Sequence, residues 1–116
     1  MSIEAADKDL NDMILQGKIM DAFEKHYADD VVMAENFDTE CVGKDANRAR
    51  ELEFLGKVGE FHGAAMVRAA VTGDVSFSEW TMDVTFKGGP RVTMRQVTVR
   101  QWKNGKVAHE RFYYKP

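Results

Sequence analysis

Residues 61–114 read FHGAAMVRAAVTGDVSFSEWTMDVTFKGGPRVTMRQVTVRQWKNGKVAHERFYY, and this stretch decides the fold of the chain. Turn signals divide it into four β-type segments, at 61–72, 75–87, 91–103 and 106–114. Four long consecutive strands with short connections predict an antiparallel meander. Because a sheet with one apolar face needs a second layer, the residues before position 61 are expected to cover it.

Those earlier residues are predicted to be mainly helical. A first helix ends near Gly17, and its apolar residues recur at helical spacing at Ile3, Ala6, Leu10, Met13 and Ile14. A second short helix is expected over 19–27, and a short strand over 31–35. A third helix at about 44–60 follows, with an apolar stripe of Ala49, Leu52, Leu55 and Val58. This order of two helices, a short strand, a third helix and four long strands predicts an α+β domain with a strongly bent sheet.

Composition sets the limits on function. The 116 residues are expected to form one domain, 1–116, with a net charge of −3 and scattered basic residues, which argues against a nucleic-acid surface. No apolar run approaches a membrane span. The start MSIEAADKDL lacks the features of a signal peptide, and the lone Cys41 excludes an internal disulfide, so we expect a cytoplasmic setting. Cys41 itself is expected to be an inert loop thiol, since no nucleophile signature surrounds it.

Two segments carry a resemblance to a known superfamily. The order of elements, the segment FEKHYADDVVMAEN at 23–36 and the final hairpin WKNGKVAHERFYY at 102–114 resemble nuclear transport factor 2-like proteins, especially the SnoaL-like and ketosteroid-isomerase-like groups. The resemblance covers nearly the whole chain. It implies a cone-shaped α+β fold with three N-terminal helices packed on a strongly bent antiparallel sheet. It implies no single activity, because this fold hosts isomerases, cyclases, dehydratases and non-enzymatic adaptors.

Strand alternation predicts which side chains face the pocket of such a cone. In the segment 75–87 the large apolar residues share one face: Trp80, Met82, Val84 and Phe86. In the next segment the resemblance and the bulk of Trp102 favour an inward set of Met94, Gln96, Thr98, Arg100 and Trp102. Val97 and Val99 then lie on the outer face, which commonly forms a dimer interface in this superfamily. We therefore expect a homodimer and a small-molecule ligand.

The final hairpin leaves two registers open. A three-residue loop at 103–105 with a bulge pairs Trp102 with Lys106 and turns Ala108, Glu110, Phe112 and Tyr114 inward. Glu110 would then lie opposite Thr98 and diagonal to Arg100, within reach of a salt bridge. A two-residue loop instead turns His109, Arg111 and Tyr113 inward, because a slip of one residue reverses every side chain.

Glu35 is the first candidate for catalysis. Aligned without gaps, residues 27–34 resemble the segment that precedes the catalytic Asp of ketosteroid isomerases, and this alignment places Glu35 on the base. A carboxylate at the mouth of an apolar cavity is suited to general-base work. The alternative is an exposed Glu at a strand end. The isomerase oxyanion-hole positions correspond to Leu10 and Thr98, which are not equivalent donors, so a true ketosteroid isomerase is not expected.

Glu110 and Arg100 form the second candidate. A buried carboxylate needs a partner, and a guanidinium provides one, so the pair could orient an anionic or carbonyl ligand. The alternative is a structural ion pair at the base of the cone. With Glu35 and Glu110 as candidate catalysts, the expected ligand contacts are Trp80, Met82, Gln96, Arg100, Trp102 and Phe112.

Metal and cofactor chemistry find no support in the sequence. His26, His62 and His109 are isolated, with no metal-ligand spacing, and none matches the His that assists the catalytic Asp of SnoaL-type cyclases. The pair Gly88-Gly89 is a turn, because no helix follows to form a phosphate site.

Two hypotheses for the function remain. The first is carboxylate acid/base chemistry at a carbon next to a carbonyl, and the second is a non-catalytic binding or association module.

Overall fold

The computed structural model describes residues 1–116, and its elements follow the expected order with one addition, a short strand at Cys41–Val42. The elements are α1 (Ile3–Leu15), α2 (Ile19–His26), β1 (Tyr27–Glu35), β2 (Cys41–Val42), α3 (Lys44–Lys57), β3 (Val58–Thr72), β4 (Val75–Phe86), β5 (Arg91–Lys103) and β6 (Lys106–Tyr113). None of the three helices has the length and apolar character needed to cross a membrane.

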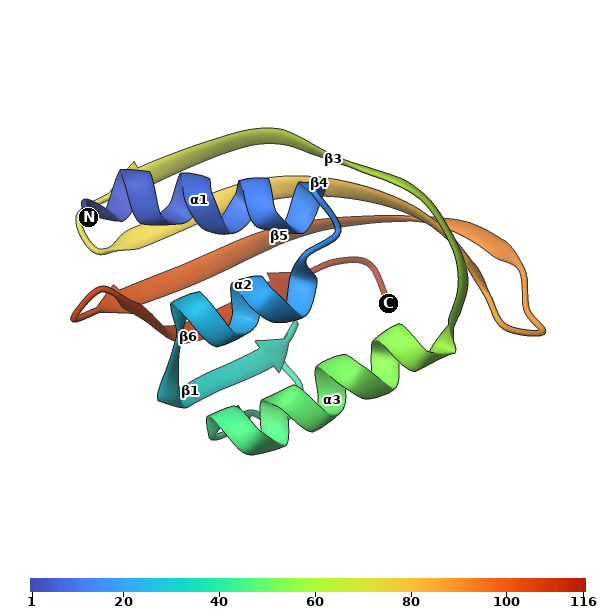
Figure 1. Cartoon of the computed structure of the whole chain (residues 1–116), viewed down its shortest axis with the longest axis horizontal. Coiled ribbons are helices and arrows are strands. Elements are labelled where there is room, and N and C mark those ends of the chain that lie inside the picture. The colour runs from blue at the N-terminus through green and yellow to red at the C-terminus, as the bar shows by residue number, and fades with distance from the viewer.

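The six strands form one curled, open sheet in the order β2-β1-β6-β5-β4-β3. The meander from β3 to β6 is antiparallel throughout, which confirms the prediction from its turn signals. Figure 1 shows α1 and α2 lying across the sheet, while α3 lies beneath the arch that the long strands make as they curl. The helix α1 packs on β3 and β4, and α3 contacts both β1 and β3.

Two details of the expected architecture are only partly matched. The helices are not all N-terminal, because α3 follows β1 and β2. The sheet is not wholly antiparallel either, since β1 pairs with β6 in parallel, from Tyr27 opposite Val107 to Glu35 opposite Phe112. Strands joined by short turns must be antiparallel, but β1 and β6 are separated by most of the chain, so no turn geometry fixes their relative direction.

The last hairpin combines features of both predicted registers. Its loop has two residues, Asn104 and Gly105, both with positive φ of 52° and 77°, and Lys103 pairs with Lys106. A bulge then follows, because Trp102 pairs with Val107 while Gln101 pairs with His109, which leaves Ala108 as the extra residue. The bulge returns Glu110 to the inner face, directly opposite Arg100 rather than Thr98, whereas Val107 takes the inner position expected for Ala108.

The apolar core lies at the end of the sheet covered by α1 and α2. It joins Ala6 and Leu10 to Ala22, Phe23, Tyr27, Val31, Met33, Trp102 and Val107. The apolar stripe predicted for the third helix is only half right: Leu55 and Val58 face inward, but Ala49 and Leu52 are exposed. The inner face of α3 instead carries Asn47, Glu51 and Phe54, so the helix presents polar groups to the interior.

The turn at Gly105 provides a test of this register. Gly105→Ala should lower the free energy of unfolding by about 1 kcal/mol, because an alanine is strained at its positive φ. The control is Gly56→Ala near the end of α3, where φ is not positive and nothing lies within 4 Å of the added methyl group. This second change should raise stability by up to about 1 kcal/mol. Equal effects of the two changes in urea denaturation would contradict the turn assignment.

Candidate functional site

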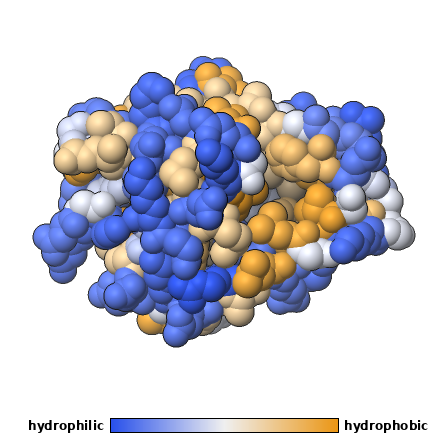
Figure 2. All heavy atoms as spheres, in the orientation of Figure 1, coloured by the Kyte–Doolittle hydropathy of each residue, from blue (hydrophilic) through white to orange (hydrophobic).

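A large cavity opens between α3 and the concave face of the sheet. Its volume is about 1460 Å³, above the ~300–1,000 Å³ common for ligand pockets. Figure 2 shows hydrophobic residues gathered between α3 and the curled ends of the long strands, to the right of centre, while hydrophilic residues dominate the left half of that face. The bent sheet and α3, which contacts both β1 and β3, enclose this space.

Apolar side chains form much of the cavity wall. Phe54, Leu55 and Val58 extend into it from the end of α3 and the start of β3, and the facing strands contribute Met82, Val84, Val92 and Met94. Phe54 meets Phe86 edge to face, with ring centroids 6.1 Å apart. Flexible thioethers among these side chains suit an apolar guest of variable shape.

The inner end is closed by a buried ionic network centred on Arg100. Its Nε donates to Oε2 of Glu110 at 2.7 Å, and its Nη1 donates to Oδ1 of Asp7 at 2.9 Å and to Oδ1 of Asn11 at 2.7 Å. The Tyr27 hydroxyl donates to the same Oε2 of Glu110 at 2.5 Å. Burial raises the pKa of Tyr27, and the adjacent Glu110 raises it further, so this phenol stays protonated as the donor.

One oxygen of this network has no partner. Glu110 is 1% exposed and lines the cavity, and its Oε1 accepts no hydrogen bond, although Oε2 accepts two. A buried polar atom without a partner is costly, and native structures contain few of them. Oε1 of Glu110 is thus a buried acceptor without a donor, on a residue that lines the cavity.

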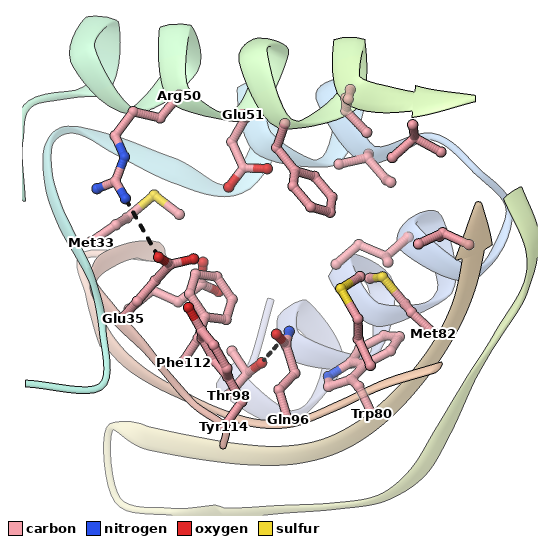
Figure 3. Close-up of a pocket in the computed structure, with 18 of the residues that line it drawn as sticks. Met33, Glu35, Arg50, Glu51, Trp80, Met82, Gln96, Thr98, Phe112 and Tyr114 are labelled. Atoms are coloured by element: carbon pink, nitrogen blue, oxygen red, sulfur yellow. Dashed lines mark hydrogen bonds and ion pairs between the residues drawn. The ribbon is translucent and has the colours of Figure 1, made fainter. Parts of the chain in front are cut away.

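Glu51 is the carboxyl that projects into the cavity from α3 (Figure 3). It is half-buried, and no hydrogen bond or ion pair ties it to a neighbouring side chain. Burial raises the pKa of Glu51 to about 7, and the negative charge of Glu110 adds to the effect. A carboxyl that titrates near neutrality can both accept and release a proton, which is the requirement for a general acid or base.

Glu35 lies at the mouth of the same cavity. Its carboxylate is 3.7 Å from the Arg50 guanidinium, and its side chain is 44% exposed. Tyr114 lies beside it, and burial together with the Glu35 charge raises the pKa of that phenol. In Figure 3, Glu35 and Arg50 face each other across one side of the opening, while Glu51 points toward the centre. Glu35 is thus a partly solvated, paired carboxylate.

Most of the side chains expected to contact a ligand do line the cavity. Trp80, Met82, Gln96 and Phe112 do so, and the Gln96 amide, 3.5 Å from the Thr98 hydroxyl, points from the sheet toward α3. Arg100 also reaches the wall, through the network described above. Trp102 is the exception and does not face the cavity. It is buried in the core, where its indole donates to the Ser76 hydroxyl at 3.0 Å.

Glu51 and Asp7 were not singled out by sequence reasoning. Both sit on helices whose inner faces were sought as apolar stripes, and a carboxylate on such a face breaks the pattern. A signal existed for Glu51, because Asn47, Glu51, Phe54 and Val58 recur at spacings of four, three and four, which places them on one face of the helix.

No three His, Cys, Asp or Glu side chains cluster in an arrangement able to hold a metal ion. His26 is buried and paired with Asp9 at 2.6 Å.

The fold and this cavity define a class of protein: small α+β domains in which a curled sheet and three helices enclose a pocket. The family model of the SnoaL-like domain matches residues 1–114, and the chain belongs to this family. A proposed SnoaL-like polyketide cyclase from Mesorhizobium loti is 36% identical, with a TM-score of 0.90 over 98% of this chain and 100% of that one. A comparison with curated protein sequences finds no significant match.

More distant structures share the fold alone. An NTF2-like protein of unknown function from Burkholderia pseudomallei is 16% identical, with a TM-score of 0.84 over 99% of this chain and 92% of that one. A ketosteroid isomerase-like protein from Catenulispora acidiphila, solved in complex with trimethylamine, is 14% identical, with a TM-score of 0.71 over 81% and 73% of the two chains.

The raised pKa of Glu51 makes stability depend on pH. The folded protein holds a proton that the unfolded chain loses between about pH 4.5 and 7, so stability falls as pH rises through this window. Glu51→Gln should therefore raise the free energy of unfolding at about pH 8 by on the order of 2–3 kcal/mol, and change it little at about pH 4.5. Denaturation at both pH values measures this, with the exposed Glu53→Gln as control. Equal stability of Glu51→Gln and wild type at the higher pH would refute the raised pKa.

Proposed function

We propose that this protein binds a small, largely apolar molecule in the cavity and moves a proton at a carbon next to a carbonyl group of that molecule. The observation that carries the proposal is Glu51, a carboxyl without a partner that projects into an apolar cavity and has a pKa of about 7. The likeness to a proposed SnoaL-like polyketide cyclase supports the same class of chemistry. In this proposal the apolar side chains bind the body of the molecule and exclude water.

Glu51 accepts the proton in this mechanism. Ionised Glu51 takes it from the carbon, and negative charge develops on the carbonyl oxygen, where hydrogen-bond donors stabilise it. The Gln96 amide faces Glu51 from the sheet and is suitably placed, and the Arg50 guanidinium lies at the mouth. The protonated Glu51 then returns the proton at the same or another atom, which completes an isomerisation or assists a ring closure.

The two carboxylates of the original prediction take other roles in this proposal. Glu35 is the second candidate base, because it lines the mouth, but it is paired with Arg50 at 3.7 Å and its side chain is 44% exposed. Glu110 is held by Arg100 and Tyr27, so we assign it to positioning rather than to proton transfer. The alternative function is a ligand-binding or association module without catalysis, which the same cavity would serve.

We also propose a homodimer formed through the outer face of the sheet. Phe77, Val97 and Tyr113 are each about 40% exposed there, at 40%, 38% and 39%. Strand pairing sets Val97 beside Tyr113 and Phe77 beside Val99, so the four side chains form one apolar patch.

We further propose that the protein functions in the cytoplasm, where a lone Cys41 stays reduced.

Proton exchange tests the chemistry without knowledge of the substrate. In D₂O the α-protons of β-tetralone, an apolar ketone, should exchange faster with the protein than with buffer alone, as followed by NMR. Glu51→Gln should lose about a hundredfold of this acceleration, whereas Glu35→Gln should keep most of it. The reverse result would make Glu35 the base. Binding of the ketone without any acceleration would favour the non-catalytic module.

The dimer is tested by light scattering after size exclusion. Wild type should elute with twice the chain mass, and Val97→Asp should elute as a monomer, because a buried unpaired charge opposes association. Leu52→Asp is the matched control, since it places the same charge at an exposed apolar position on α3. A monomeric wild type at micromolar concentration would refute the proposed interface.

A further inference from the structure

The inner end of the cavity carries one uncompensated negative charge. Asp7 and Glu110 share the single guanidinium of Arg100, and all three side chains are at least 96% buried. Tyr27, Asn11 and Ser76, the other partners in the network, are neutral. Burying net charge is unfavourable unless a counter-charge is supplied, and the protein supplies none at this end.

The unpaired Oε1 of Glu110 shows where that charge lacks a partner. Its sister oxygen, Oε2, is saturated by the Arg100 Nε and the Tyr27 hydroxyl, whereas Oε1 accepts nothing and belongs to a residue that lines the cavity. Glu51 extends toward the same space from α3 and also has no partner. Two carboxyl groups that lack partners therefore belong to residues that line one cavity.

We propose that the ligand of this cavity carries a protonated amine, which pairs with Oε1 of Glu110 at the inner end. An ammonium group supplies both the missing hydrogen-bond donor and the missing positive charge. An organic cation fits better than a metal ion, because no three potential ligands are clustered. The aromatic rings of Phe23, Trp80 and Phe112 also line the cavity and favour an organic cation.

This pairing also affects Glu51. The charges that act on Glu51 are Arg50 on its own helix, Glu35 from β1 and Glu110 from β6. Tyr27 and Arg100 line the same cavity, and Glu51 in turn raises the pKa of Tyr27. Glu110 is the protein charge that most raises the pKa of Glu51. An ammonium on Glu110 cancels that charge and lowers the pKa, so binding of the ligand would ionise Glu51 and ready it to accept a proton.

This inference rests on the proposed ligand-binding role of the cavity, and three pyrene probes separate the two claims. They share one apolar body and differ in the group they carry: 1-pyrenemethylamine, 1-pyrenemethanol and 1-pyreneacetate. Binding is followed by pyrene fluorescence. The amine should bind at least about tenfold more tightly than the alcohol, and the acetate more weakly than both. If none of the three binds, the ligand-binding function itself fails. If the alcohol binds as well as the amine, the function stands and the ammonium subsite is refuted.

The pH dependence of binding locates the subsite. The probe amine stays protonated between about pH 6 and 8, so its affinity should rise by up to about tenfold over this range as Glu51 becomes easier to ionise. The alcohol should show no such rise, and Glu51→Gln should abolish it for the amine.

Glu110→Gln should remove the preference for the amine, since its amide presents a donor to the cavity while its oxygen can still accept from Arg100. Glu60→Gln, an exposed change outside the cavity, should leave all three affinities unaltered. If Glu110→Gln does not fold, the wild-type probe series and the Glu51→Gln pH profile decide the question. An amine preference that survives in a folded Glu110→Gln would overturn the proposal.

Discussion

The ion pairs of Arg100 hold together the parts of this protein that lie furthest apart in sequence. One guanidinium on β5 binds Asp7 on α1 and Glu110 on β6, and through Glu110 it reaches Tyr27 at the start of β1. Removing one member would leave the others buried without compensation, a far larger loss than that of an exposed ion pair. The network therefore fixes where α1 lies on the sheet, and with it the inner wall of the cavity.

The same constraint explains why the cavity can remain open. The main apolar cluster lies at the end of the sheet beneath α1 and α2, and α3 contributes no residue to it. The cavity opens between α3 and the sheet, and Leu10, Phe23, Tyr27 and Met33 belong to the core cluster and also line the cavity. The polar inner face of α3 suits this arrangement, because Asn47 donates to backbone carbonyls at the helix start while Glu51 is left free to face the cavity.

Local patterns predicted the elements well because each depends on its own residues. The turns at Gly73, Gly88 and Gly105 and the alternation around Trp80 gave the meander and the apolar wall. The parallel pairing of β1 with β6 could not be found this way, since it joins segments brought together only by the whole fold. Trp102 and Ala49 were misplaced for a related reason: periodicity assigns a face, but not whether that face meets core, cavity or solvent. Glu51 was missed because a search for apolar stripes passes over a carboxyl.

The bulge at Ala108 determines the charge of the cavity. A two-residue turn followed by a regular ladder would set His109 opposite Arg100 and turn Arg111 inward, giving the cavity a basic wall in place of Glu110. The single extra residue at the Ala108 bulge decides whether the pocket wall is acidic or basic. Relatives can therefore reverse the charge preference of the pocket by a change in strand length alone, with every neighbouring side chain conserved. A sequence alignment of relatives can therefore match a residue that faces the pocket with one that faces outward. Pocket residues on the last strand should instead be matched by their strand-pairing positions, counted from the turn.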